Sequence, residues 1–451
     1  MHTEAQYRVA IVGGGVAGLT LALACEQLQI SYILLEAKPS IVQEEGASVG
    51  LQPNGLIVLD QLGVLDKIED KSSYLHTWRH VNGNGDLLST IHALKECTAD
   101  SSLTYGVNFF ARSELLKAMY TQIKYRAAVQ AAKRVVAIST NAEFATVHVD
   151  DGSAVTAELV IGADGVHSCV RRHIDSTTSV SSLPVLPALS SEFACVFGMS
   201  DAVSGVSDGE AYSLYCEHAA VILFTGKNGR LFWFVVEPLG QLLPYAKTPR
   251  YTRWDAEKAC LSVSHLRMNS TACFKDVWES RTAAFKIGLE EGMAPTWVGN
   301  RAVLVGDACH KMVPALAMGA NQAIGSAAVL INELFRLFSK TPTIPAPLEA
   351  LQKSLNSYTE QRQEWVRQVI AAAGMGYRWQ LSCGLSEAAK EKQVRTFTDA
   401  GWGRQVYQSF LNLPVVEALP LTERGHKCQQ ALRRFSQADE CRRSEADREL
   451  P

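Results

Sequence analysis

Residues 9–18 read Val-Ala-Ile-Val-Gly-Gly-Gly-Val-Ala-Gly, an apolar run that ends in a cluster of glycines. Residues 19–28 are mostly apolar, and Tyr32-Ile33-Leu34-Leu35 follows after a short polar interval. A short apolar run bounded by glycine is typical of a buried strand, whereas a longer one is typical of a helix. The stretch therefore predicts a strand, a glycine turn, a helix and a second strand, which together form a βαβ unit.

The glycines of this turn have separate uses. Gly13 permits the tight turn out of the strand, Gly15 lets the backbone approach a pyrophosphate, and Gly18 permits close packing of the helix. The N-terminus of the helix presents free N–H groups to phosphate charge. Glu36 stands at the end of the second strand, where a carboxylate can accept hydrogen bonds from both ribose hydroxyls. The pattern predicts a site for an adenine dinucleotide.

Two later segments repeat the apolar run. Leu159-Val160-Ile161-Gly162 and Ala302-Val303-Leu304-Val305 each end at a glycine followed within two residues by an aspartate. Buried parallel strands are continuous apolar runs that end at functional loops, so we expect all three runs in one sheet. Residues 192–236 are instead rich in aromatic side chains on short runs, with a turn signal at 226–229. That texture predicts an inserted antiparallel sheet.

These patterns predict an α/β fold with a Rossmann-like nucleotide domain, an inserted antiparallel substrate domain and C-terminal helices. The nucleotide domain is expected to be discontinuous, over residues 1–180 and 290–345, with the substrate domain at 181–289. Apolar residues from Leu348 to Ile370 recur on one face of a long helix, which places a helical region at 346–420. Residues 421–451 carry charges of both signs and few large apolar side chains, so we expect a solvated, partly disordered tail.

The composition favours a small-molecule partner. The 451 residues are 47% hydrophobic and 20% charged, with a formal net charge of −3, so nothing drives the chain toward nucleic acid. The 11 cysteines contain no C-x-x-C pair, which favours free thiols. His76 and His80 are four residues apart, but no second ligand pair follows, and we expect no metal site.

Neither a secretory signal nor a membrane span is expected. Residues 1–8 are polar, without the long apolar core of a signal peptide. The most apolar long stretch, 313–338, is interrupted by Asn321, Gln322, Asn332, Glu333 and Arg336. A span would bury these groups in lipid. We expect a soluble cytoplasmic protein, with peripheral membrane association left open.

Two further motifs complete a family resemblance. They are Asp164-Gly165-Val166-His167-Ser168-Cys169-Val170-Arg171 and Gly306-Asp307-Ala308-Cys309-His310-Lys311-Met312-Val313-Pro314. With the glycine loop, they resemble the three fingerprints of the single-component FAD-dependent monooxygenases, the aromatic-hydroxylase-like flavoproteins. Residues 43–63 are similar to the fungal paxilline-type branch, which epoxidises prenyl chains of meroterpenoids and indole diterpenes. The resemblance covers roughly residues 7–400.

The resemblance implies noncovalent FAD, with NADPH or NADH as a transient reductant and O2 as a substrate. It implies that Glu36 holds the adenosine ribose, that Gly50 lies near the flavin or its linker, and that Arg112 contacts the cofactor. It further implies that Asp307 binds the ribityl or phosphate region and that the backbone near Ala320 faces the isoalloxazine ring. For Asp164 and Arg171, a structural pairing and a cofactor role both stay open.

The chain departs from the family pattern in three places. The family commonly has P-x-x-G-x-G before the flavin, where this chain has Pro314-Ala315-Leu316-Ala317-Met318-Gly319. It also has an acidic pair after N-x-A-I, where this chain has Gly325-Ser326. Alanine restricts the backbone more than glycine does, so these departures bear on cofactor affinity or turnover. The fungal branch often carries a hydrophobic C-terminal anchor, which the polar end of this chain does not resemble.

The resemblance implies a monooxygenase acting on a hydrophobic secondary metabolite, with prenyl-chain epoxidation favoured over aromatic ring hydroxylation. It places an active-site tyrosine in the antiparallel sheet, and we choose Tyr215, whose hydroxyl can donate a hydrogen bond. Tyr212 is an equal occupant of that role, and a packed aromatic is the structural alternative. The substrate, the choice of NADPH or NADH and the oligomeric state are not legible from the sequence.

Two rival classes are considered. Gly46-Ala47-Ser48-Val49-Gly50 matches the G-x-S-x-G of α/β-hydrolases, but that reading needs a strand directly before Ser48 and a helix directly after it. Polar residues precede it and Pro53 follows closely. The second rival is a flavin-fold protein without redox turnover, either a cyclase or a binding module, which Ala317 and Gly325-Ser326 bring into view.

Overall fold

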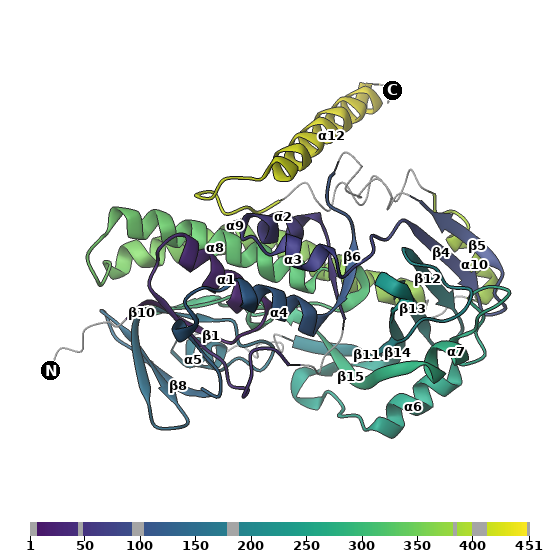
Figure 1. Ribbon diagram of the computed structural model, residues 1–451, viewed down its shortest axis with the longest axis horizontal. Coiled ribbons are helices and arrows are strands. Elements are labelled where there is room, and N and C mark those ends of the chain that lie inside the picture. The colour runs from purple at the N-terminus through teal and green to yellow at the C-terminus, as the bar shows by residue number, and fades with distance from the viewer. Residues whose placement is uncertain are drawn as a thin grey trace.

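The computed structural model describes residues 7–43, 48–92, 103–177, 189–381, 386–398 and 413–448. Two eight-stranded sheets occupy opposite ends of the molecule (Figure 1). Helix α9 (Leu348–Leu381) packs on strands of both sheets, so it ties the two ends together. The α/β fold with an antiparallel second sheet and C-terminal helices is the one that the sequence predicts.

The first sheet is built around the glycine-rich segment. Its central strand β1 (Tyr7–Val12) lies parallel to β2 (Tyr32–Leu35) on one side and β10 (Ala154–Gly162) on the other. Strand β17 (Ala302–Leu304) continues the parallel set beside β10. The three apolar runs therefore share one sheet, as predicted, and their carboxyl ends meet at one edge.

The remaining elements of this end of the molecule frame that edge. Helix α1 (Val16–Gln27) follows β1 and is buried on most sides by α8 (Gly319–Lys340) and α4. The strand order is β16-β17-β10-β1-β2-β7, with β9 pairing β10 and β8 pairing β9. The bounds are β7 (Val129–Gln130), β8 (Val135–Thr140), β9 (Ala145–Val149), β16 (Val298–Gly299), α4 (Arg112–Gln122) and α5 (Cys169–Thr177).

The second sheet has the order β18-β15-β11-β14-β13-β12-β4-β5. All its pairs are antiparallel except β12 with β4. Helices α6 (Arg253–Ser262) and α7 (Phe274–Glu279) cover one of its faces. The strand bounds are β4 (Thr77–Asn82), β5 (Leu87–Ile91), β11 (Leu189–Ser200), β12 (Glu210–Tyr215), β13 (Ala220–Thr225), β14 (Leu231–Pro244), β15 (Arg281–Met293) and β18 (His310–Lys311).

This sheet extends beyond the expected substrate segment, residues 181–289, of which 181–188 lie outside the described residues. The hairpin of β4 and β5 comes from the expected nucleotide segment, and β15 continues to Met293. Strand β4 shows only a weak alternation of polar and apolar residues. Its Arg79 and His80 form hydrogen bonds to Glu210 and Tyr215 of the neighbouring strand β12. The partner strands β4 and β12 are far apart in the sequence, so no local sequence pattern predicts that they pair.

A small ribbon and a set of helices join the sheets. The two-stranded ribbon pairs β3 (Ser48–Leu51) with β6 (Asn108–Ala111), and α2 (Pro53–Gln61) and α3 (Leu65–Glu69) follow β3. Helix α8 (Gly319–Lys340) is buried along most of its length and packs on α1, α2 and α9. The predicted apolar face of α9 is buried, with Leu351, Leu355 and Tyr358 at its centre.

The C-terminal segment differs from the expectation of a partly disordered tail. Helix α12 spans Glu423–Arg448 and projects from the body (Figure 1). Its first turns are anchored, since Arg424 donates to Glu69 at 2.7 Å and Cys428 is fully buried. The segment is rich in good helix formers, and a few anchoring contacts suffice to order a polar helix that composition alone assigns to solvent.

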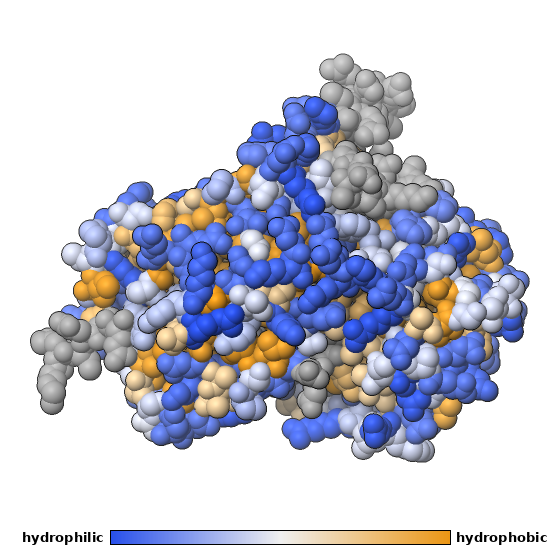
Figure 2. Space-filling model, viewed as in Figure 1, coloured by the Kyte–Doolittle hydropathy of each residue, from blue (hydrophilic) through white to orange (hydrophobic). Residues whose placement is uncertain are grey.

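Along the described residues, no helix is both long enough and apolar enough to cross a membrane. The eight cysteines whose side chains the structure describes form no disulfide with one another, and no group of three or more metal-binding side chains gathers in the described ranges. The face in Figure 2 is largely hydrophilic, with hydrophobic side chains in small separate groups.

Candidate active site

The glycine loop between β1 and α1 adopts the geometry that its spacing predicts. Gly13 has a φ of +107°, and a Cβ atom there would lie 2.4 Å from the carbonyl oxygen of Ala163. At Gly18 a Cβ atom would lie 1.9 Å from the carbonyl oxygen of Gly13. Only glycine fits at either position. Helix α1 is thereby held close to the turn, with its N-terminus at the carboxyl edge of the sheet.

Charged side chains surround this N-terminus. Gly15 is the N-cap of α1 and carries no side chain to cap the free N–H groups. A Cβ atom on Gly15 would come within 3.6 Å of the Arg112 guanidinium, at the start of α4. Burial lowers the pKa of Arg112, while Asp307 and Glu36 oppose that shift. The N-terminus of α1 and this cation therefore place positive charge at one corner of the cleft.

Glu36 closes the loop from the other side. Its Oε2 accepts from the N–H of Gly14 at 2.6 Å, and its Oε1 accepts from the N–H of Lys38 at 2.8 Å. The carboxylate therefore stands at the end of β2 beside the glycine loop, where the sequence places it. Its proposed contact with a ribose stays a prediction.

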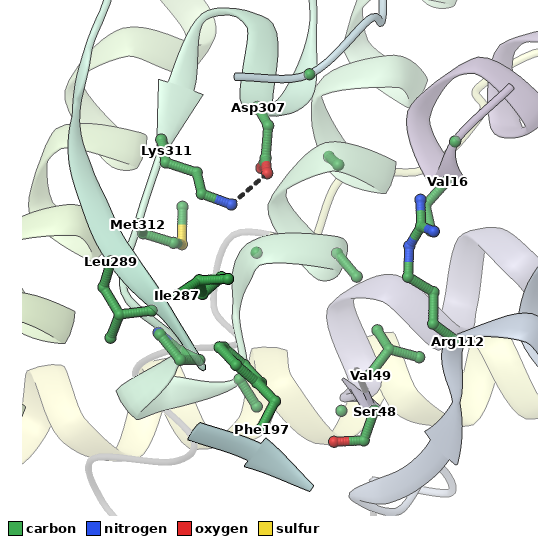
Figure 3. Close-up of a pocket in the computed structure, with 18 of the residues that line it drawn as sticks. Val16, Ser48, Val49, Arg112, Phe197, Ile287, Leu289, Asp307, Lys311 and Met312 are labelled. Atoms are coloured by element: carbon green, nitrogen blue, oxygen red, sulfur yellow. Dashed lines mark hydrogen bonds and ion pairs between the residues drawn. The ribbon is translucent and has the colours of Figure 1, made fainter. Parts of the chain in front are cut away.

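A cleft of about 360 Å³ opens beside the glycine loop. It contains five of the predicted cofactor residues, which come from five separate segments of the chain. Figure 3 shows Arg112 and Val16 on one side and Asp307 with Lys311 on the other. The five predicted residues that line the cleft are Gly15, Gly50, Arg112, Asp307 and Ala320.

An ion pair occupies one wall of the cleft. Lys311 Nζ lies 2.6 Å from Asp307 Oδ2, and the dashed line in Figure 3 marks this contact. Burial alone would raise the pKa of Asp307, but the charge and hydrogen bond of Lys311 lower it overall. Burial alone would lower the pKa of Lys311, but Asp307 raises it overall. Both side chains are therefore charged at neutral pH.

The opposite wall is apolar. Phe197 stacks on Phe285 with ring centroids 5.6 Å apart and meets Phe234 edge-on at 5.3 Å. Ile287 and Leu289 extend this wall along β15, and both point into the cleft (Figure 3). The many aromatic residues in this part of the sequence predict the sheet. They do not show which rings face the cleft, because that depends on the register of the strands.

Two residues that the sequence analysis leaves without a site role hold the cleft together. Asn321 donates from Nδ2 to the carbonyl oxygens of Gly50 and Ala317, and its Oδ1 accepts from the N–H of Gln52. It thus fixes β3 to the start of α8. Lys311 lies in a quoted motif, but only the structure shows that it faces Asp307.

Ala317 shows what its departure from the family pattern means. Its φ is +51° and its ψ is 28°, the left-handed region in which glycine is normally found. Its Cβ atom would lie 2.7 Å from a Cβ atom placed on Gly50. The backbone therefore takes the turn that glycine would take, at a cost in strain, and Gly50 must itself be glycine.

Asp164 and Arg171 do not form a pair with each other. Asp164 Oδ2 accepts from the N–H of Cys169 at 2.7 Å and caps α5. Arg171 donates to the carbonyl oxygens of Val166, at 2.5 Å, and Ala308, at 2.8 Å. Arg171 therefore ties the second motif to the third. The sequence leaves a structural role and a cofactor role open for these two residues, and the contacts that they make are structural.

Tyr215 is not among the residues that line the cleft. It lies on the same sheet face as Phe197, but three strands away, and its hydroxyl bonds to His80 Nδ1 at 2.8 Å. Burial raises its pKa. Tyr212 points to the other face and donates to Glu210. Tyr215 therefore stands away from the cleft lining, and its catalytic role stays a prediction.

The hydrolase reading fails on local structure. Gly46 and Ala47 lie outside the described residues, but Ser48 is itself the first residue of β3. A nucleophile elbow places the serine between a strand and a helix. Here the next helix, α2, begins only at Pro53.

The cleft fits an FAD molecule. Its glycine loop and the uncapped N-terminus of α1 suit a pyrophosphate, and Glu36 lies beyond the loop for a ribose. The cavity then continues from Gly15 to Ala320, past the Asp307–Lys311 pair, to the N-terminus of α8. Positive ends of two helices and two cations therefore face one elongated site.

Comparisons with known proteins agree with this geometry. A family described as "FAD binding domain" matches residues 6–373. The FAD-dependent monooxygenase ausM of Aspergillus calidoustus is 33% identical over 425 residues, covering 94% of this chain and 90% of the relative. The FAD-dependent monooxygenase terM of Tolypocladium album is 37% identical over 332 residues, covering 73% of this chain and 69% of the relative.

Solved structures share the fold at lower identity. HpxO of Klebsiella pneumoniae, complexed with FAD and uric acid, gives a TM-score of 0.70 at 21% identity and covers 90% of this chain and 97% of its own. CtdE in complex with FAD and a substrate gives 0.66 at 18% identity and covers 96% and 98%. The family match spans most of the chain, and curated relatives exceed 30% identity over most of their length. The chain belongs to the FAD-binding family of FAD-dependent monooxygenases.

Proposed function

We propose that this FAD-dependent monooxygenase epoxidises an alkene in the prenyl chain of a hydrophobic secondary metabolite, with NADPH or NADH as the reductant. The observation that carries the proposal is that two kinds of side chain line the cleft. The charged ones are Arg112 on one side and Asp307 with Lys311 on the other, and Phe197 and Phe285 belong to the apolar wall.

The apolar wall suits a hydrocarbon. Rings and branched aliphatic side chains exclude water and hold a prenyl chain without polar contacts. Hydroxylation of a phenol is helped by a base that takes up the phenolic proton, and on this wall Glu290 is the one carboxylate among the described lining residues. Epoxidation of an alkene needs no such base and is supported by the apolar side chains, whereas Glu290 is the candidate base for the alternative, ring hydroxylation.

The charged side chains of the cleft suit the cofactor. When FAD is bound, its reduced ring activates O2 for transfer of one oxygen atom to an electron-rich substrate. The N-terminus of α1 and Arg112 would bind the pyrophosphate, and Asp307 would accept a hydrogen bond from the ribityl chain. Lys311 keeps Asp307 ionised, and the N-terminus of α8 offers positive charge to the ring. The apolar wall keeps water from the reacting atoms.

The test is a product analysis. The purified FAD protein would be incubated with NADPH or NADH, ¹⁸O₂ and a farnesylated aromatic compound. The proposal expects one ¹⁸O atom in the prenyl chain as an acid-labile epoxide. A label on the aromatic ring would instead establish ring hydroxylation. Substrate consumption without any label would favour the cyclase alternative.

A matched pair of variants connects the product to the cleft. Phe197→Leu changes the apolar wall and should lower product formed per NAD(P)H oxidised. Phe274→Leu alters a fully buried ring on α7, which packs against Trp233 on the other face of the same sheet, and should leave that ratio unchanged. Equal ratios of product to oxidised NAD(P)H in both variants would show that the apolar wall does not affect oxygen transfer.

A further inference from the structure

Arg362 is a buried cation on α9 with neutral partners. Its side chain belongs to a residue that is 1% exposed. Its Nη2 donates to Gln322 Oε1 at 2.6 Å, and its Nε donates to Ser326 Oγ at 3.2 Å. Within the described ranges, no carboxylate forms an ion pair with it. A buried charge without an opposite charge is costly, so its retention calls for an explanation.

The cation is unpaired because of two neighbouring residues on α8. A Cβ atom on Gly325 would lie 3.6 Å from Arg362 Nη2 and 2.9 Å from Pro414 Cγ. Gly325 and Ser326 are the positions at which the family pattern has its acidic pair. An acid at either place would face the guanidinium. Burial lowers the pKa of Arg362 to about 10, which still leaves it charged at neutral pH.

This cluster backs the wall of the cleft. Ala323 lines the cleft, and Ser326 lies one helical turn, about 5 Å, deeper along α8. Ser326 Oγ also bonds to His310 Nε2 at 2.9 Å, and His310 precedes Lys311 of the cleft. Burial and the charge of Arg362 lower the pKa of His310 to about 4, so His310 is neutral. Arg362 is therefore the charged side chain in the cluster that it forms with Gln322, Ser326 and His310.

We propose that Arg362 is a fixed positive charge that favours the reduced, anionic form of the bound flavin. Reduction adds two electrons and one proton, so the ring gains one negative charge. A buried cation attracts that charge more than a solvent-exposed cation does. Arg362 does not line the cleft, so it would act through its field rather than by contact. The inference rests on FAD binding and is independent of which substrate is oxidised.

The test uses a substitution that changes charge but not shape. Gln322→Glu keeps the acceptor 2.6 Å from Nη2 and converts it to a carboxylate that pairs with Arg362. We expect reduced FAD to bind about tenfold less tightly relative to oxidised FAD, a fall of about 30 mV in the two-electron midpoint potential. The apoprotein should melt at a higher temperature than wild type, because the buried cation gains a partner.

Gln430→Glu, on the exposed side of α12, makes the same change in net charge and is the matched control. A midpoint potential of Gln322→Glu equal to that of Gln430→Glu would overturn the proposal. So would a lower melting temperature of the Gln322→Glu apoprotein. If Gln322→Glu does not retain FAD, the midpoint potentials of Arg362→Lys and Arg362→Met test the proposal instead. Lys should keep the potential and Met should lower it, and equal potentials in these two variants would overturn the proposal.

Discussion

The backbone of Ala317 concentrates strain at the mouth of the flavin cleft. An alanine in the left-handed region brings its Cβ atom close to the following carbonyl oxygen, whereas glycine has no such conflict. The turn cannot relax, because Asn321 holds the carbonyl oxygen of Ala317 at 2.8 Å. The fold therefore imposes the conformation on a residue that does not prefer it.

Ala317→Gly should raise the free energy of unfolding by roughly 0.5–1 kcal/mol, because relief of the strain exceeds the entropy that glycine adds to the unfolded chain. Urea denaturation at fixed FAD concentration measures this. Ala315→Gly is the control, since Ala315 lies in the preceding turn without a positive φ, and it should be destabilising. A destabilised Ala317→Gly would show that the methyl contact with Gly50 outweighs the strain.

Two aspartates at strand ends differ in what they face. Asp307 faces the cleft and Lys311, while Asp164 caps α5. Asp307→Ala should therefore release FAD, with at least a tenfold rise in its dissociation constant, as expected for the loss of a charged hydrogen bond. Asp164→Ala should lower the free energy of unfolding by about 1 kcal/mol and keep FAD. Flavin fluorescence titration measures both, and equal dissociation constants would contradict the assignment.

Tyr215→Phe distinguishes a packed tyrosine from a catalytic one. The change leaves His80 Nδ1 without its hydroxyl partner, so the free energy of unfolding should fall by about 1–3 kcal/mol. If the residue only packs, product per NAD(P)H oxidised stays at the wild-type value. A fall in that ratio, with hydrogen peroxide released instead, would restore the catalytic role that the sequence analysis gives it.

At the scale of elements, the cleft depends on how α8 meets the β3–β6 ribbon. Asn321 makes two hydrogen bonds across this junction, to Gly50 and Gln52, and a third to Ala317 just before α8, and it is 1% exposed. Asn321→Ala should cost about 2–4 kcal/mol of unfolding free energy, since several buried polar groups lose their partners. It should also weaken FAD binding, because Gly50 is no longer held against the cleft.

Asn332→Ala is the matched control on the same helix. Asn332 also bonds backbone groups, the carbonyl oxygen of Val415 and the N–H of Glu417, but at the end of α8 remote from the cleft. It should lower stability without changing the FAD dissociation constant. If both variants bind FAD with wild-type affinity, the junction at Asn321 serves stability alone.

Prediction from sequence succeeds where the physics is local. The turn at Gly13 and Gly18 follows from steric limits within a few residues, and the three apolar runs identify their own sheet. It fails where register and long-range contacts decide. The hairpin of β4 and β5 joins the second sheet through Arg79 and His80, whose partners are distant in the sequence. In the sequence Asn321 is only one polar residue in an apolar helix, and its role becomes visible when the structure places β3 beside it.

At the scale of the whole molecule, two buried histidines couple stability to pH. His80 lies in β4 and His310 in β18, both strands of the second sheet, and each is 1% exposed. Burial lowers the pKa of each from 6.5 to about 4, with Arg362 contributing for His310. The carboxylates with lowered pKa values, such as Asp307 and Glu69, lose their stabilising charge only below their usual range near 4.

The free energy of unfolding should therefore fall between pH 7 and pH 5. The unfolded chain takes up a proton on each histidine near pH 6.5, whereas the folded chain does so only near pH 4, so acid favours unfolding in that window. Each histidine contributes roughly 1–2 kcal/mol. Urea denaturation at pH 7, 6 and 5 with constant FAD measures the fall. His80→Gln keeps an acceptor for Tyr215 but cannot titrate, so it should remove about half of the loss. A loss equal to wild type would mean that His80 is already protonated in the folded protein at pH 5.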